Sequence, residues 1–176
     1  MGVTPTSGSD RDRDRNAAAG AHVSGSQGYG LLVVRCATDA RYDARTLPRA
    51  LDPVVAFRLA QVTPRDAVVA RLDEHAHCVG LAVRDEVDAL LHAEAVVAAF
   101  RSPVVTGGAM WHLRVNVGVA VRQPGAIRST TGLLREARVA LLQAARLGPG
   151  CALLFDPDTR HVASARVCRC RRRGHT

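Results

Sequence analysis

The sequence predicts one α+β domain, a sheet of short strands with helices packed mainly on one face. Apolar runs and amphipathic segments alternate in the order strand, helix, strand, strand, helix, strand, strand, helix, strand. One domain is also the expectation for 176 residues. The domain is predicted over 29–158, between a disordered segment over 1–28 and a basic, disordered tail over 159–176.

The first strand and the first helix carry local signals. Residues 29–34 are a short apolar run typical of a buried strand. Asp52 is expected to be the N-cap of the following helix, with Pro53 in its first turn. Four apolar residues of this helix are predicted to face the core: Val54, Val55, Leu59 and Val62.

The middle of the chain predicts two paired strands and a second helix. Apolar runs over 67–72 and 78–83 flank the polar stretch 73–77, a pattern typical of a hairpin. A helix is predicted over 87–100, because its apolar residues recur at helical spacing.

The last third predicts a second hairpin, a third helix and a final strand. Gly107-Gly108 separates the runs 104–106 and 110–121, and paired glycines suit a tight turn between strands. Residues 130–146 have apolar positions at helical spacing, and residues 151–155 form the last apolar run.

These segments, in this order and spacing, resemble the GGDEF (diguanylate cyclase) family. The matching segments are 31–34, 100–108, 115–120, 133–144 and 153–157. The resemblance covers nearly all of 29–158 and implies the nucleotide-cyclase fold, a ferredoxin-like palm whose central antiparallel sheet has helices packed around it. The pentapeptide Asp-Glu-His-Ala-His at 73–77 stands where the family has Gly-Gly-Asp-Glu-Phe.

The resemblance also implies what an active site of this family requires. In active members, carboxylates of the first strand and of the signature loop hold two magnesium ions. Those ions activate a ribose hydroxyl of GTP for attack on an α-phosphate. In this chain Arg35 stands at the first-strand aspartate, and His75 and Ala76 stand at the loop's aspartate and glutamate.

Other positions of the family's site differ as well. Asp73 and Glu74 replace the two glycines that let the backbone approach the phosphates, His77 replaces the phenylalanine, and Ala145 replaces a phosphate-binding lysine. Because metal, phosphate and backbone features are lost together, the sequence predicts no enzymatic activity, no catalytic residue, no metal and no cofactor.

Three functional hypotheses follow. The leading one is a regulatory or protein-interaction module in bacterial cyclic di-GMP signalling, with a protein partner or a second copy of the chain. The alternative is a sensor that binds GTP or cyclic di-GMP without turnover, through a remnant base pocket of Asp43 and Asp52. An aspartate can accept from guanine N1–H and N2–H. The plainer interpretation is a loop acid at Asp43 and a helix cap at Asp52.

The third hypothesis is weak nucleic-acid binding through a basic tail. Five arginines lie in the last eleven residues: Arg166, Arg169, Arg171, Arg172 and Arg173. Subtracting these five charges from the net +8 leaves +3 for the rest of the chain. Arginine clusters bind phosphate backbones through charge, but no aromatic residue lies among these to stack on bases. Nucleic acid is therefore not the expected partner.

Histidine and cysteine patterns predict neither a metal site nor a disulfide framework. On a strand, His75 and His77 would project to the same face, because they are two residues apart. A metal site would also need His92 or His112 as a further ligand.

The five cysteines and the absence of a secretory segment favour a cytoplasmic protein. No run is long and apolar enough to span a bilayer, so no membrane association is expected. Whether the chain is a fragment of a longer GGDEF–EAL protein is left open by the sequence.

Overall fold

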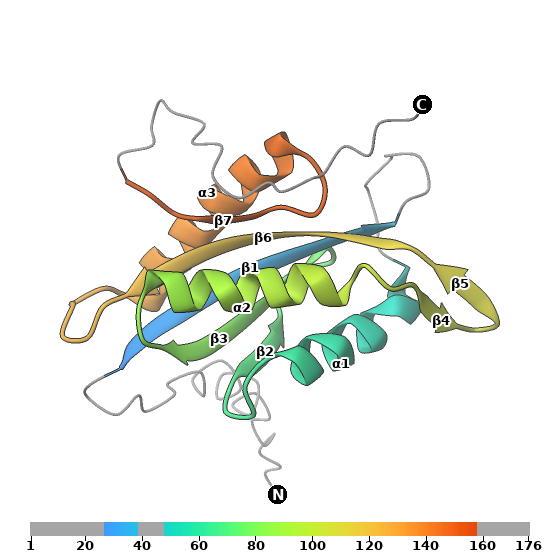
Figure 1. The fold of residues 1–176 in the computed structure, drawn as a ribbon, viewed down its shortest axis with the longest axis horizontal. Coiled ribbons are helices and arrows are strands. Elements are labelled where there is room, and N and C mark those ends of the chain that lie inside the picture. Colours follow the sequence, from blue (N-terminus) through green and yellow to red (C-terminus); the bar gives the residue numbers. More distant parts are fainter. Residues whose placement is uncertain (1–26, 39–47, 158–176) are drawn as a thin grey trace, which may run out of the picture.

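The computed structural model describes residues 27–38 and 48–157 (Figure 1). Predictions that fall on other residues, including Asp43 and the arginine tail, lie outside the described residues and stay predictions. The elements are β1 (Gly28–Thr38), the 3₁₀ turn η2 (Arg49–Leu51), α1 (Asp52–Val62), β2 (Val68–Arg71), β3 (Ala76–Val83), α2 (Glu86–Ala99), β4 (Val104–Thr106), β5 (Ala109–Trp111), β6 (Leu113–Arg122), α3 (Thr130–Leu147) and β7 (Ala152–Leu154).

Five strands form the main sheet in the order β2-β3-β1-β6-β7, and β4 and β5 form a separate two-stranded hairpin. The central strand β1 pairs antiparallel with both β3 and β6, while β7 adds parallel to β6. The α+β class predicted from the sequence is confirmed, and the predicted order of elements differs in one place, where one expected strand is replaced by the two strands β5 and β6.

The helices divide between the two faces of the sheet. Leu32, Val34 and Cys36 of β1 belong to the core beneath α1 and α2, whereas Leu31 and Val33 belong to a second core beneath α3. Figure 1 shows α2 across one face of the strands and α3 behind them. The expectation that the helices lie mainly on one face is therefore wrong for α3. The middle of β1, residues 30–34, is buried throughout because side chains of a strand alternate between two packed faces.

Close backbone packing holds α3 against β6. A Cβ atom at Gly118 would overlap the carbonyl oxygen of Ala137 and the backbone of Leu141. Ala137 is fully buried at this contact. Glycine at this strand position thus lets the middle of α3 approach the sheet directly.

The β4–β5 turn confirms the predicted hairpin. Gly107 and Gly108 have φ of 57° and 76°, the left-handed values that a two-residue hairpin turn requires. The run predicted as one strand over 110–121 is interrupted at His112, so that β5 pairs only with β4 and β6 joins the main sheet.

The start of α1 differs from the prediction. Asp52 is the first helical residue rather than the N-cap, which is Leu51 with φ −86° and ψ −18° and no side-chain cap. The 3₁₀ turn η2 leads directly into the helix, so the residue before it already has helical backbone angles. A capping side chain needs an extended backbone at that position. The carboxylate of Asp52 consequently does not cap the helix and contacts Arg71 and His77 instead.

None of the helices in the described part of the chain is both long and apolar enough to cross a membrane.

Candidate functional site

The register of the central strands places Arg35 between two residues of interest. Arg35 of β1 lies opposite Ala76 of β3 on one side and opposite Asn116 of β6 on the other. Residues directly opposite in an antiparallel pair project to the same face with Cβ atoms about 5 Å apart. Arg35, Ala76 and Asn116 therefore form a row across the sheet on the α3 face, where Ala76 is buried.

The β2–β3 turn is closed by backbone hydrogen bonds and by the side chain of Asp73. The backbone N–H groups of Leu72 and Asp73 both donate to the carbonyl of Ala76, at 2.9 and 3.2 Å. The N–H of His75 donates to Oδ1 of Asp73 at 2.9 Å, an Asx turn. Asp73 Oδ2 also lies 3.5 Å from an Nη atom of Arg138 on α3. The aspartate at the family's first glycine position is therefore a structural residue of this turn.

A second set of contacts joins the same hairpin to α1. Asp52 Oδ2 lies 3.2 Å from Nη1 of Arg71, and its Oδ1 lies 3.3 Å from Nε2 of His77. Arg71 and His77 are opposite each other in the β2–β3 register. Both carboxylate oxygens of Asp52 thus face groups of the hairpin, and a base that bound this carboxylate would have to displace Arg71.

His77 is buried, with 2% of its surface exposed. Among the residues that the structure describes, neither ring nitrogen has a hydrogen-bond partner of good geometry, although Nε2 lies near Asp52. Burial lowers the pKa of His77, and Asp52 opposes this only in part. The imidazole is therefore expected to be neutral at pH 7. In contrast, burial, and secondly Asp52, raise the pKa of Cys36 to about 12, so that this thiol is not a nucleophile at neutral pH.

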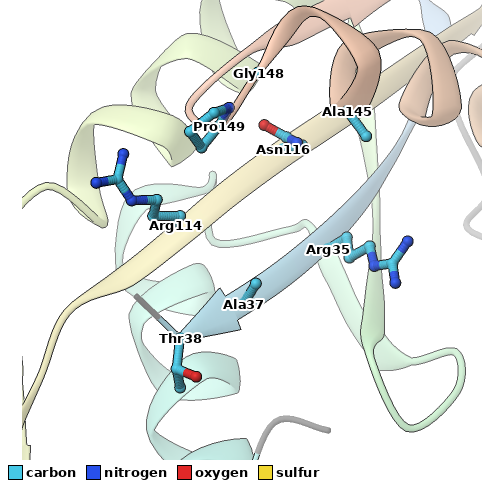
Figure 2. A pocket seen from close by; sticks show the side chains of 8 residues that line it. All are labelled: Arg35, Ala37, Thr38, Arg114, Asn116, Ala145, Gly148 and Pro149. Carbon is cyan, nitrogen blue, oxygen red and sulfur yellow. The ribbon is translucent and has the colours of Figure 1, made fainter. Parts of the chain in front are cut away.

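A pocket of about 200 Å³ opens at the carboxyl end of β1, on the α3 side of the sheet (Figure 2). It is lined by Arg35, Ala37, Thr38, Arg114, Asn116, Ala145, Gly148 and Pro149. In Figure 2, Asn116 lies between the two arginines, whose guanidinium groups point away from it in opposite directions. A more open hollow of about 310 Å³ lies beside it and shares Arg114 and Pro149.

The histidines that the sequence analysis considered and did not favour as metal ligands lie in different surroundings. His75 is half-buried on the turn, whereas His77 is buried in the core beside Asp52. Within the described residues, no group of three or more histidine, cysteine, aspartate or glutamate side chains is placed to hold an ion.

Comparison with known proteins identifies the fold. No protein-family model matches the chain, and no curated protein sequence matches it. Solved structures do. The EAL/GGDEF domain protein of M. capsulatus is 22% identical, with a TM-score of 0.65 over 78% of this chain and 90% of that one. The GGDEF domain of YfiN (TpbB) from Pseudomonas aeruginosa is 23% identical, with a TM-score of 0.63 over 74% and 83%.

This protein has the GGDEF fold. A third similar structure is the diguanylate cyclase SiaD of Pseudomonas aeruginosa in complex with its activator SiaC, which is 18% identical. Its TM-score is 0.56, over 73% of this chain and 50% of that one. The fold predicted from the order of segments is thereby confirmed.

Within the GGDEF fold, the positions that the resemblance assigned to one site are neighbours in space. Arg35, Ala76 and Ala145 come from β1, β3 and α3, and Arg35 and Ala145 line the same pocket. Sequence reasoning did not single out Asn116 or Arg71. The signal for Asn116 was a lone polar residue inside the apolar run of β6. The signal for Arg71 was its place in the predicted β2–β3 hairpin, in which it lies opposite His77.

Proposed function

We propose that this GGDEF-fold domain does not synthesise cyclic di-GMP and acts as a regulatory or protein-interaction module in cyclic di-GMP signalling. The observation that carries the proposal is the row formed by Arg35, Ala76 and Asn116. It contains no carboxylate at the positions where the family's resemblance implies metal ligands.

Electrostatics supports the loss of metal binding. A guanidinium at Arg35 repels a cation at about 4 Å by roughly 4 kcal/mol per unit charge, at the effective dielectric of a protein surface. Magnesium requires oxygen ligands, mostly carboxylates and waters, and Ala76 offers none. Such a row lacks the carboxylate ligands that the two-metal chemistry of nucleotidyl transfer requires.

The signature turn supports the same conclusion. Asp73 and Glu74 add negative charge where phosphates would approach, and Asp73 is already committed to His75 and Arg138. A glycine-rich turn can bring its backbone N–H groups close to a ligand. In this turn the side chain of Asp73 instead accepts the N–H of His75.

The test of this proposal is an activity assay of the purified chain. GTP is supplied with Mg²⁺ or with Mn²⁺, and the products are separated by chromatography, with an active diguanylate cyclase assayed in parallel. We expect no cyclic di-GMP above the no-protein background. Sustained turnover by this chain would overturn the proposal.

An interaction role is supported by the SiaD–SiaC complex, in which a protein with a similar domain binds an activator protein. The β4–β5 hairpin also presents Val105 and Met110, which are directly opposite in register and 69% and 64% exposed. Light scattering after size-exclusion chromatography would separate a homodimer from a monomer that needs a different partner. A strict monomer that captures no partner in cross-linking would contradict this part of the proposal.

The guanine-nucleotide sensor is the alternative. It requires the carboxylate of Asp52 to release Arg71 and to bind a guanine base instead. The side chain of Arg71 is 44% exposed, so it can move away into solvent. The other residue of that hypothesis, Asp43, lies outside the described residues. Saturable GTP binding that Asp52→Ala abolishes in a folded protein would favour the sensor.

A further inference from the structure

The β4–β5 hairpin has one face in the core and one face in solvent. Val104 is buried, and Trp111 opposite it packs against the same core. Side chains of a strand alternate between faces, so the next pair, Val105 and Met110, lies on the other face, where both are largely exposed. Figure 1 shows the hairpin at one end of the domain, beyond the start of β6. This pair is therefore an apolar patch on a projecting part of the molecule.

The hairpin also leaves backbone groups unpaired on its outer edges. A two-residue turn joins Thr106 to Ala109, and the pair that flanks such a turn exchanges hydrogen bonds. Because bonded and non-bonded pairs alternate, the N–H and C=O groups of Val105 and Met110 point away from the hairpin. Among the described residues, β4 and β5 pair only with each other, and no other backbone group bonds to these two residues. Such edges are templates for a further strand.

The two edges differ in their capacity to pair. On the β4 side, the residue two positions before Val105 is Pro103, which has no N–H to donate. On the β5 side, the residue two positions after Met110 is His112, which keeps its N–H. Since proline on an edge discourages the addition of a strand, the β5 edge is the better template.

Charge favours a second copy of this chain as the added strand. The chain has a net charge of +8, so two copies repel each other wherever charged surfaces approach. Residues 103–113 contain no lysine, arginine, aspartate or glutamate. A contact through this segment buries apolar side chains without placing like charges opposite each other. A two-fold axis also presents the same patch from both copies, so the patch has to match only itself.

We propose that β5 pairs antiparallel with β5 of a second copy, about a two-fold axis at Met110. The two hairpins then form one four-stranded sheet. Met110 and Met110 of the partner subunit exchange two N–H···O bonds, and their side chains contact each other on the exposed face. This inference rests on the interaction role proposed above and names the partner. The contact is small, so the dimer is weak and its population depends on concentration.

Sedimentation equilibrium of the full chain tests the proposal. The molecular mass is measured over a wide range of protein concentration, at low and at high salt. We expect a monomer–dimer equilibrium that shifts towards the dimer in salt, because salt screens the repulsion between two chains of net charge +8. A monomer at every concentration would overturn the proposal. A dimer that dissociates in salt would also overturn it, since ionic contacts would then hold the copies together.

Charged variants locate the contact. Met110→Asp places two like charges opposite each other at the axis and should weaken the dimer by about tenfold or more. Leu91→Asp makes the same kind of change on α2, at a side chain that is 55% exposed, and should have no effect. Equal losses in both variants would overturn the hairpin as the contact.

Proline variants distinguish the two edges without adding charge. Met110→Pro removes the outward N–H of β5, and Val105→Pro removes that of β4. Neither N–H is needed within the hairpin, where proline on an edge is tolerated. Only Met110→Pro should abolish the dimer, and equal effects of the two would overturn pairing through β5. Circular dichroism checks that each variant is folded, and the aspartate pair decides the result if a proline variant is not.

The outcome is separable from that of the proposed function. A monomeric chain that captures another protein in cross-linking would overturn the pairing of two copies and keep the interaction role. Formation of cyclic di-GMP would overturn only the absence of catalysis.

Discussion

The two hairpins of this protein, β2–β3 and β4–β5, close their turns by different means. In β4–β5, Gly107 and Gly108 adopt left-handed backbone angles, and no side chain is needed. In β2–β3 the turn contains no glycine, and Asp73 accepts the N–H of His75 instead. The backbone sets the first turn, and a side chain sets the second.

The hairpins also differ in how they are joined to the rest of the domain. Asp73 of the β2–β3 turn lies against Arg138 of α3, while Arg71 and His77 contact Asp52 of α1. Because α1 and α3 cover opposite faces of the sheet, this hairpin is held from both sides. The contrast shows that a side chain can take the part in a hairpin turn that glycines with left-handed backbone angles take in another.

The largest expected effect comes from Gly108→Val in the backbone-determined turn. A non-glycine residue with a left-handed backbone costs about 1–2 kcal/mol, and a β-branched one costs the most. The hairpin is coupled to global unfolding through Val104, which is buried in the core. Chemical denaturation should show this loss, whereas Thr106→Val, which places the same side chain in the adjacent strand, should change the free energy of unfolding by less than about 0.5 kcal/mol. Equal effects of both variants would contradict a role of the turn conformation.

A smaller effect, about 1 kcal/mol, is expected for Asp73→Ala in the side-chain-determined turn, since it removes one turn hydrogen bond and one exposed ion pair. Asp73→Asn is the matched control, because an asparagine keeps the acceptor but loses the charge. Both are measured by denaturation at moderate salt. If Asn is as destabilising as Ala, the ion pair with Arg138, rather than the Asx turn, holds the hairpin.

The smallest effect should appear between pH 7.5 and 6. The folded-state pKa of His77 is lowered below the ordinary value of 6.5, mainly by burial, while Asp52 and Asp73 oppose the shift and Arg71 supports it. The unfolded chain therefore takes up a proton before the folded chain does, and the free energy of unfolding falls as pH drops through 6.5 towards the folded pKa. Unfolding curves at several pH values should show a steeper fall for the native chain than for His77→Gln. Identical pH profiles would show that His77 is not buried as described.

Most of the architecture could be predicted from local patterns. The Gly107-Gly108 turn, the apolar spacing of α3 and the apolar run of β1 each depend on neighbours in sequence, which is why these predictions were close. The α1 start could not be predicted in the same way. Asp52-Pro53 has the composition of a cap, but the 3₁₀ turn before it changed the backbone at that position.

By itself, the sequence determined the places of the three helices and of most strands, and the absence of carboxylates at positions 35, 75 and 76, because composition and periodicity are local properties. Only the tertiary structure decided that α3 packs on the face opposite α1 and α2, that Asp52 meets Arg71 and His77, and that Arg35 and Asn116 share a pocket. Each of these depends on the register of strands far apart in the chain, and a shift of one residue would turn every side chain to the other face.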